Sequence, residues 1–409
     1  MTEIVTLAVV GGGSRGEGAY GEWALRHPDR ARVVAVAEPR QIRRERFARA
    51  HGAELVVADW RELLRSGGKV ADAVVIATPD AEHTEPAIAF AEAGYHILLE
   101  KPMAPSEADC RRIATAAHEA GVIFAVGHVL RYTPYTRALR EALPAIGEIV
   151  SVHHLEPVGF WHQAHSFVRG NWRREDHSTF MLMSKSCHDI DWLSHVVGRP
   201  IARVASFGSL QHFTAQHRPE GAADRCLDCA VEPTCPYSAK RFYFGRLHDG
   251  RHGWPLDVVV EDFTEAALTE ALRDGPYGRC VYACDNDVVD HQVVALEFAG
   301  GATGTFTMTG FTEAGDRRTS IFGTRGSLEG DGERIRVFDF LTGSARVIEV
   351  DAHGGHGGGD DGLMDAFIGA VATGDRSRVL SGPRESLHTH LAVFAAERAR
   401  RSGSVVTLA

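Results

Sequence analysis

Two lysines of this sequence stand where they could act on a reacting oxygen. Only four of the 44 Lys and Arg residues are lysines, at positions 69, 101, 185 and 240. An ammonium can lose its proton when burial lowers its pKa, whereas a guanidinium keeps its charge in proteins. Drift in base composition is the alternative, and it suffices for the lysine at 69 in its glycine-rich turn. Lys101, in the run Glu100-Lys101-Pro102, and Lys185 are therefore candidates for holding and polarising a hydroxyl oxygen.

A histidine follows Lys185 closely, in a segment that opens a predicted helix. Chemistry at a hydroxyl oxygen needs a base that takes the hydroxyl proton near neutral pH. Histidine, with an unperturbed pKa of about 6.5, can do this untuned, whereas the lysine value of about 10.4 must first be lowered. We therefore expect His188 to be the acid/base, with Lys101 and Lys185 beside it. The alternatives are a core histidine bonded to backbone, and a salt bridge from Lys185 to Asp189 or Asp191.

A glycine-rich loop suited to a dinucleotide follows the first predicted strand. Residues 3–10 are apolar and rich in β-branched side chains, and a helical stretch runs to about residue 27 after the loop. This is G-x-G-x-x-G between a strand and a helix, where glycines let the backbone approach a pyrophosphate. An incidental glycine-rich turn is the alternative. The predicted contacts come from Gly11, Gly13, Ser14, Arg15 and Gly16.

An acidic residue ends the second predicted strand, which covers residues 32–37. There Glu38 can accept hydrogen bonds from the adenosine ribose hydroxyls, and its charge disfavours a 2′-phosphate. We therefore expect NAD as the cofactor. Arg40 could turn toward a 2′-phosphate, which leaves NADP open.

Strands and helices continue to alternate through the first third of the chain. Strands are predicted at 53–57, 72–77, 95–99 and 122–126, with helices near 40–51, 59–66, 83–93 and 105–120. This order is typical of a parallel sheet with helices on both faces, whose ligands bind at the carboxyl ends of the strands. Thr78-Pro79-Asp80, Glu100-Lys101-Pro102 and Gly127-His128 end strands there. Lys101 is therefore expected beside the nicotinamide, although a solvated strand end is the alternative.

These segments resemble the glucose–fructose oxidoreductase, inositol dehydrogenase and MocA family. The matching pieces are GGGSRG, the stretch from Ala77 to Ala104 with its Glu-Lys-Pro motif, and VGHVLRYTP from Val126 to Pro134. The resemblance implies an α/β plus α+β fold. An N-terminal Rossmann domain, here residues 1–128, would precede a domain of residues 129–409 built on a large, mostly antiparallel open sheet. The active site would lie between them.

The resemblance also implies roles for particular residues. Lys101 would contact both substrate and cofactor, and family members mostly oxidise a secondary alcohol of a sugar or cyclitol. The family usually has an aspartate four residues before the histidine matched by His188, and here Ser184 stands in its place. The outer face of the sheet would pair subunits, so a homo-dimer or homo-tetramer is expected. The cofactor site would be lined by Thr78, Pro79, His83 and Glu100, to which we add His128.

The second half of the chain alternates strands with turns. Strands are predicted at 149–156, 293–298, 303–309, 318–323, 327–329, 334–340 and 345–350, and a closing helix near 385–401. The glycine-rich residues 353–362 are expected to form a flexible loop, a candidate lid, before a helix that starts at Leu363.

A loop dense in His, Arg and Trp follows the predicted strand 149–156. Aromatic faces stack on the C–H bonds of a sugar, and polar groups bond its hydroxyls. A solvated irregular loop is an equal alternative. The predicted substrate residues are Arg131 from the preceding motif and Trp161, His162, His165, Arg169, Asn171 and Trp172.

A cysteine cluster lies in a predicted insertion near residues 212–262, which interrupts the sheet pattern. Its C-x-x-C-x5-C spacing, in a protein expected in the cytoplasm, favours a metal over disulfides. Four such thiolates would hold a structural zinc ion, and free thiols in a loop are the alternative. The ligands would be Cys226, Cys229, Cys235 and Cys284, or Cys280 in place of the last.

The composition excludes several classes of protein. The chain has 409 residues, of which 44% are hydrophobic and 24% charged, as in a globular protein of two domains. A net charge of −10 without a basic tract argues against a nucleic-acid partner. The sequence shows neither a signal peptide nor an apolar run of membrane-spanning length. We expect a soluble, cytoplasmic protein with a small-molecule sugar or cyclitol substrate.

Three functions compete. The first is an NAD-dependent dehydrogenase that oxidises a secondary hydroxyl of a sugar, glycoside or cyclitol. The second is a glycosidase that oxidises a sugar hydroxyl on bound NAD, eliminates the aglycone and then reduces the product. The third is a non-catalytic regulator that senses dinucleotide. Lys101 and His188 argue against the regulator, although fold alone does not decide activity.

Overall fold

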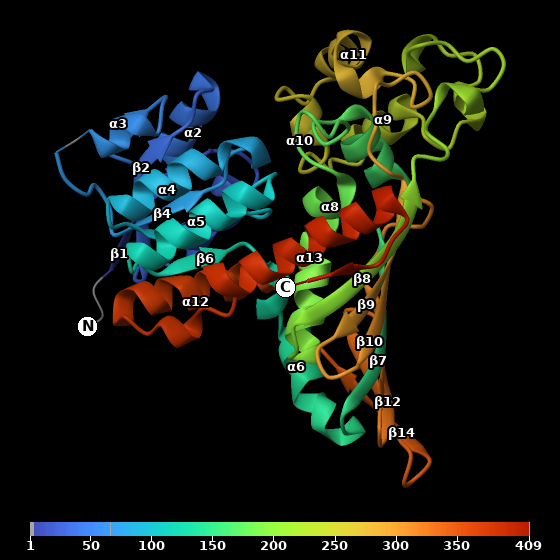
Figure 1. Ribbon diagram of the computed structural model, residues 1–409. Coiled ribbons are helices and arrows are strands. Elements are labelled where there is room, and N and C mark those ends of the chain that lie inside the picture. The colour runs from blue at the N-terminus through green and yellow to red at the C-terminus, as the bar shows by residue number, and fades with distance from the viewer. Residues whose placement is uncertain (1–3, 66, 409) are drawn as a thin grey trace.

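The computed structural model describes residues 4–65 and 67–408, which form two bodies (Figure 1). Residues 1–3, 66 and 409 lie outside the described residues; they include the first residue of the predicted strand 3–10, the last of the predicted helix 59–66 and the last of the second domain. One body is built on a six-stranded sheet and the other on a nine-stranded sheet. Within the described part of the chain, no helix is both long and apolar enough to cross a membrane.

The N-terminal body has a parallel sheet of strand order β3-β2-β1-β4-β5-β6. Strands β1, β4 and β5 are almost wholly buried and aliphatic because each face of the sheet carries its own apolar core. The order reverses between β1 and β4, which is where a Rossmann fold binds its ligand. The predicted alternation is confirmed by β1 (Val5–Val10), α1 (Glu22–Arg26), β2 (Ala31–Ala37), α2 (Gln41–His51), β3 (Leu55–Val57), α3 (Arg61–Leu64), β4 (Ala73–Ile76), α4 (Thr84–Glu92), β5 (His96–Leu99), α5 (Glu107–Glu119) and β6 (Phe124–Val126).

The C-terminal body has a mostly antiparallel sheet of order β14-β13-β12-β11-β7-β10-β9-β8-β15, in which β7 and β10 pair in parallel. One face packs on α6 (Pro134–Ala142), α8 (Met181–Val197) and α13 (Pro383–Ser402) around a shared core. The open-sheet fold implied by the resemblance is therefore confirmed, and β8 and β15 have no counterpart among the predicted strands. The strands are β7 (Ile149–Pro157), β8 (Ile201–Ser209), β9 (His291–Phe298), β10 (Thr303–Thr309), β11 (Arg318–Gly323), β12 (Gly326–Gly330), β13 (Arg334–Asp339), β14 (Ser344–Glu349) and β15 (Val406–Thr407).

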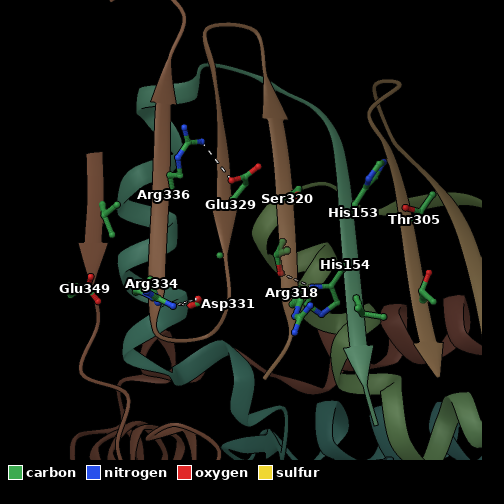
Figure 2. A pocket seen from close by; sticks show the side chains of 15 residues that line it. His153, His154, Thr305, Arg318, Ser320, Glu329, Asp331, Arg334, Arg336 and Glu349 are labelled. Atoms are coloured by element: carbon green, nitrogen blue, oxygen red, sulfur yellow. Dashed lines mark hydrogen bonds and ion pairs between the residues drawn. The ribbon is translucent and has the colours of Figure 1, made fainter. Parts of the chain in front are cut away.

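The opposite face of this sheet is uncovered by any helix of the described residues (Figure 1). It forms a shallow groove of about 770 Å³ (Figure 2). Arg336 and Glu329 form an ion pair of 3.5 Å across β13 and β12, while His153 and Thr305 stand on β7 and β10. We call this surface the open face.

Two C-terminal helices return to the N-terminal body. Helix α12 (Gly359–Thr373) adds Leu363 and Phe367 to a core shared with β1 and α1, and α13 packs on α5 as well as α8. Helix α12 begins before the predicted start at Leu363. The carboxylate of Asp360 in its first turn binds Arg15 at 2.9 Å, so residues 359–362 of the predicted loop are helical, while residues 353–358 form a loop as predicted.

The predicted insertion lies between β8 and β9 and occupies residues 210–290, more than the expected 212–262. Its helices have an apolar core of their own, which includes Tyr243, Leu256 and Leu268. Of the extra residues, Leu268, Leu272 and Tyr277 belong to this core, whereas Val288 and Val289 pack in the core of the sheet. The helices are α9 (Ala239–His248), α10 (Leu256–Val259) and α11 (Glu265–Asp274), and α7 (Phe160–His162) precedes them in the loop after β7.

Candidate active site

The glycine loop after β1 forms a cradle that side chains would fill. A Cβ at Gly11, where φ is 95°, would lie 2.5 Å from the carbonyl oxygen of Ala77. A Cβ at Gly16 would lie 1.9 Å from the carbonyl oxygen of Gly11. Both contacts are too close, so both positions require glycine. A Cβ at Gly13 would meet nothing nearer than 4.0 Å, which leaves that side of the loop open to a pyrophosphate.

Glu38 is fixed at the end of β2 beside this loop. Its Oε2 accepts a hydrogen bond of 2.8 Å from the N–H of Gly12, and its Oε1 accepts one of 2.9 Å from the N–H of Arg40. The residue is 6% exposed, whereas Arg40 is exposed. Two backbone bonds thus orient a carboxylate whose remaining lone pairs are free for ribose hydroxyls.

The loop after β4 contributes a hydroxyl that suits a ligand. Thr78 Oγ1 is buried and has no hydrogen-bond partner among residues 4–65 and 67–408. His83 is fully buried, and its Nδ1 and Nε2 lie 2.7 and 3.0 Å from the carbonyl oxygens of Pro102 and Thr78. His83 therefore braces two strand-end loops from behind, while Pro79 is exposed at the surface. Together with the glycine cradle and Glu38, these residues fit NAD.

Arg15, predicted to contact the cofactor, instead points into a buried ionic cluster. Its Nε donates to Glu100 Oε1 at 2.6 Å and its Nη2 to Asp360 Oδ1 at 2.9 Å. The Tyr20 hydroxyl also donates to Glu100. Burial opposes ionisation, but Arg15 and Tyr20 together hold the pKa of Glu100 below its usual range. The charged carboxylate then accepts the N–H of Lys101 at 2.9 Å and fixes that backbone.

Lys101 joins the two bodies. Its Nζ donates a hydrogen bond of 2.6 Å to the carbonyl oxygen of Ser184 in the first turn of α8. Lys185 and His188 follow on the same helix. The structure therefore brings the three predicted catalytic residues to one place, between the end of β5 and the start of α8.

A charged network holds these α8 residues from the sheet side. Lys185 Nζ pairs with Glu156 Oε1 at 2.7 Å, and not with Asp189 or Asp191 as in the alternative considered above. Arg317 Nε lies 2.9 Å from Glu156 Oε2 and 2.7 Å from Asp189 Oδ1. Glu156 ends β7 and Arg317 precedes β11. No local pattern marks either residue, because only the pairing of β7 with β11 brings them together.

Burial lowers the pKa of two histidines near the start of α8, His188 and His162. Burial, with the positive charges of Lys101, Arg317 and Lys185, lowers the pKa of His188 well below its usual range, against the opposing charge of Asp189. Burial, with the charges of Lys185 and Lys101, likewise lowers the pKa of His162. His162 thus lies within the electrostatic influence of both lysines that are predicted to be catalytic. A neutral imidazole can accept a proton, as a base must.

Three of the predicted substrate residues form hydrogen bonds to other parts of the protein. Arg131 forms bonds of 2.6 and 2.7 Å to both carboxylate oxygens of Asp191. His165 is buried and lies 2.6 Å from the Tyr243 hydroxyl, which ties it to the insertion. Arg169 donates to the carbonyl oxygens of Arg279 and Tyr237 at 2.7 and 2.8 Å. These side chains support the site instead of lining it.

The other predicted substrate residues, and His128 of the predicted cofactor site, differ in their burial and in the part of the protein that they contact. Trp161 and His162 form an aromatic cluster with Trp254 of the insertion, at ring distances of 5.4 and 4.9 Å. Trp172 donates from Nε1 to Asp80 at 3.2 Å and so contacts the N-terminal body. Asn171 is exposed, whereas His128 is fully buried. Burial lowers the pKa of His128 to about 3.

The predicted zinc site is not supported. Among the described residues, no three His, Cys, Asp or Glu side chains are placed to hold a metal ion. Cys226, Cys229, Cys235 and Cys280 line one small cavity, but the predicted ligand Cys284 is not part of its lining. The Sγ of Cys284 donates to the carbonyl oxygen of Cys280 at 3.2 Å instead. Cys280, the alternative to Cys284, therefore lies with the other three cysteines, but these residues are not placed to hold a metal ion.

Comparison with known proteins gives sequence relatives that cover part of the chain. It is 41% identical over 129 residues to inositol 2-dehydrogenase 1 of Saccharopolyspora erythraea, across 30% of this chain and 37% of the relative. It is 30% identical over 142 residues to 2,7-anhydro-N-acetylneuraminate hydratase of Escherichia coli, across 34% of this chain and 37% of that enzyme. Both matches thus span little more than a third of the relative.

Wider matches cover both bodies. A levoglucosan dehydrogenase in complex with NADH has a similar fold, with a TM-score of 0.71 at 20% identity over 100% of both chains. Residues 5–128 match an oxidoreductase family with an NAD-binding Rossmann fold, and residues 140–408 match the C-terminal α/β domain of an oxidoreductase family. The chain therefore belongs to the oxidoreductase family that joins an NAD-binding Rossmann fold to a C-terminal α/β domain, the family that its glycine loop and Glu-Lys-Pro motif resemble.

Proposed function

We propose that this protein oxidises a secondary hydroxyl of a sugar, glycoside or cyclitol by hydride transfer to NAD. The observation that carries the proposal is the contact of 2.6 Å between Lys101 Nζ and the carbonyl oxygen of Ser184. It sets a lysine from the dinucleotide side against the helix that bears His188 and Lys185. Similarity to an inositol dehydrogenase supports the substrate class.

The residues of the chain divide the work as follows. Bound NAD supplies the acceptor for the hydride that leaves the carbinol carbon. The ammonium of Lys101 donates to the substrate oxygen and stabilises the negative charge that develops there. His188 takes the hydroxyl proton. Burial is the main reason that the pKa of His188 is lowered, and Lys185, paired with Glu156, adds a positive charge that lowers it further.

NAD is the proposed cofactor rather than NADP. Glu38 is buried and held by two backbone N–H groups, so it cannot move away from a 2′-phosphate without losing both bonds. Arg40 is exposed and its side chain is free to turn, which is the reason to test both cofactors.

A second candidate is a reaction that begins with the same hydride step and ends in elimination. The similarity to 2,7-anhydro-N-acetylneuraminate hydratase favours it. The two candidates differ in the fate of the hydride: a dehydrogenase accumulates NADH, whereas a redox-neutral eliminase returns the hydride to its product.

Incubation with a panel of sugars, cyclitols and glycosides tests both. We expect NADH to accumulate, seen by its absorbance, with at least one free sugar or cyclitol. Release of an aglycone without NADH would favour the second candidate. Lys101→Met serves as the control that should abolish either signal. No turnover of any kind across the panel would argue against the proposed substrate class.

We propose that two or four copies assemble through the open face. At its centre, four residues are paired side by side on adjacent strands β8, β9, β10 and β7 and form a row: Phe207, Val293, Thr307 and Leu155. Phe207 is 71% exposed, a large cost for a phenyl ring in water. A second copy would cover this row.

The cysteines support a reducing compartment, and we propose the cytoplasm. All seven are free, and they all lie in the described residues. Four of them line one cavity without forming a disulfide. Free thiols that line one cavity without forming a disulfide are typical of proteins in a reducing compartment.

A further inference from the structure

Two groups of opposite hydrogen-bonding character compete for one ring nitrogen of His188. Its Nε2 lies 2.8 Å from Nη2 of Arg317 and 3.5 Å from Oδ2 of Asp189. Its Nδ1 is buried and has no partner among the described residues, and the same is true of Asp189 Oδ2. One ring nitrogen of His188 therefore has two competing neighbours, and the other has no hydrogen-bond partner among the described residues.

The two competitors demand different tautomers. A guanidinium only donates, so its contact with Arg317 requires a lone pair on Nε2 and places the ring proton on Nδ1. A carboxylate only accepts, so a bond to Asp189 requires the proton on Nε2 and leaves the lone pair on Nδ1. Only this second tautomer can take a proton at Nδ1.

Arg317 can leave Nε2 without leaving its site. Its Nε is anchored by Glu156 at 2.9 Å and by Asp189 Oδ1 at 2.7 Å. Lys185 in turn holds the other oxygen of Glu156 at 2.7 Å. Rotation about the Cδ–Nε bond would move Nη2 off Nε2, while Nε itself, which lies on the rotation axis, would stay close to both carboxylates.

We propose that Arg317 is a positioning residue that sets the tautomer of His188, and thereby whether this histidine can act as a base. While Nη2 rests on Nε2, the ring presents an N–H donor at Nδ1. When Nη2 turns to a substrate oxygen, the ring proton relocates by exchange from Nδ1 to Nε2 and bonds Asp189 Oδ2. Nδ1 is then the proton acceptor.

The chemical step is balanced by the proposed dehydrogenase reaction, on which this part of the inference rests. The hydroxyl O–H breaks and its proton goes to the Nδ1 lone pair. The carbinol C–H breaks with its electron pair, which passes to the nicotinamide as hydride. The ring ends as an imidazolium paired with Asp189, which accepts from Nε2. Reprotonation of a carbonyl product reverses the same path.

The tautomer is measured directly by nuclear magnetic resonance. In protein labelled with ¹⁵N-histidine, long-range ¹⁵N–¹H correlations distinguish a ring protonated on Nδ1 from one protonated on Nε2, and His188→Gln identifies the signals of His188. We expect the Nδ1–H tautomer in the wild type, without cofactor or substrate. In Arg317→Met we expect the Nε2–H tautomer. Arg49→Met, which removes an exposed arginine of α2, should leave the wild-type pattern.

A wild-type ring protonated on Nε2, or an unchanged tautomer in Arg317→Met, would overturn the inference. Removal of Arg317 leaves two buried carboxylates with less compensation, so the variant could fail to fold. In that case the wild-type spectrum alone tests the inference, because a ring protonated on Nε2 would contradict it. Because this measurement needs no turnover, it stands apart from the proposed function, which fails only if no substrate is turned over.

Kinetics supply a second readout. His188 is faced by Lys101, Lys185 and Arg317, which lower its pKa, and by Asp189, which raises it. Arg317→Met removes one cation, so the acidic limb of the kcat/KM profile should shift to higher pH. Arg317→Lys keeps the charge and should return the limb toward its wild-type position. A limb that is unmoved in Arg317→Met would contradict the role of Arg317.

Discussion

Lys101 donates from Nζ to the carbonyl oxygen of Ser184 at 2.6 Å. Lys101 belongs to the strand ends of the Rossmann body, and Ser184 to the first turn of α8 in the other body. This bond uses one of three ammonium N–H groups, so two remain for a substrate oxygen. The contact therefore places the ammonium of Lys101 between the Rossmann body, which binds the cofactor, and helix α8.

Lys101→Met should abolish turnover and leave NAD binding largely intact. Methionine matches the length of the lysine stem but offers no donor to the substrate oxygen. The cradle glycines and Glu38 are untouched by the change. Quenching of intrinsic fluorescence would measure the Kd for NAD, and NADH formation would measure kcat. A large loss of NAD affinity would mean that Lys101 acts mainly on the cofactor.

His188→Ala should lower kcat by about a hundred-fold or more, the usual contribution of a general base. Because its pKa lies well below the ordinary value, the base is already neutral in mildly acidic solution. We therefore expect wild-type kcat/KM to hold below pH 6.5, where a free histidine of pKa about 6.5 is protonated. Near-normal rates in His188→Ala would transfer the role to Lys185 or His162.

Glu38→Ala should narrow the preference for NAD over NADP. The wild-type carboxylate is fixed by the N–H groups of Gly12 and Arg40, so it meets a 2′-phosphate with an unshielded charge. Alanine removes this repulsion and also the proposed hydrogen bonds to the ribose hydroxyls. Titration with both cofactors should show weaker NAD binding and stronger NADP binding. Tighter NADP binding in the wild type would reverse the proposal.

The buried histidines predict how stability depends on pH. Burial lowers the pKa of His128 to about 3 and that of His390 to about 4, whereas in the unfolded chain each is about 6.5. At a pH between the folded and unfolded pKa values, these histidines are protonated in the unfolded state and neutral in the folded state. The free energy of unfolding should therefore fall as the pH drops below about 6.5, by roughly 1.4 kcal/mol per pH unit for each such histidine.

Urea unfolding at a series of pH values between 7.5 and 5 would measure this, with the buffer pH as the only variable. His128→Asn should make the dependence shallower, because it removes one of the groups that must take up a proton. Paired carboxylates such as Asp191, whose pKa is about 2, act in the same direction but below about pH 4. A free energy of unfolding that stays level across this range would contradict the assignment of neutral buried histidines.

The Rossmann body and the cofactor residues follow from local sequence. Short aliphatic runs, a glycine loop and the acid at 38 are patterns that neighbouring residues create, and the structure places them as expected. The scarcity of lysine and the motifs around Lys101 and His188 predict their catalytic roles, which stay predictions; the structure places Lys101 against the helix that carries His188. Arg15 shows the limit: its place in the loop predicts a phosphate contact, but Asp360, from the far end of the chain, draws it inward.

The substrate side was harder to predict because its partners are remote in the chain. Glu156 and Arg317 meet at the site only through the register of β7 and β11. His165 and Arg169 looked like ligand-binding residues, but the insertion that buries them lies after them in the sequence. A loop dense in histidine and arginine does not reveal which of its side chains another segment will cover.

Phe207→Glu should dissociate the assembly. Phe207 is 71% exposed in the structure, so the change leaves the core of the protomer untouched. Between two copies, however, a carboxylate would be buried against the row that contains Val293, at a cost that a polar partner does not offset. Light scattering after gel filtration should show a dimer or tetramer for the wild type and a smaller species for the variant.

Leu341→Glu is the matched control, since Leu341 is 93% exposed in the turn between β13 and β14, away from this row. A wild type that is monomeric at micromolar concentration, or a Phe207→Glu variant of unchanged size, would show that the open face does not pair copies.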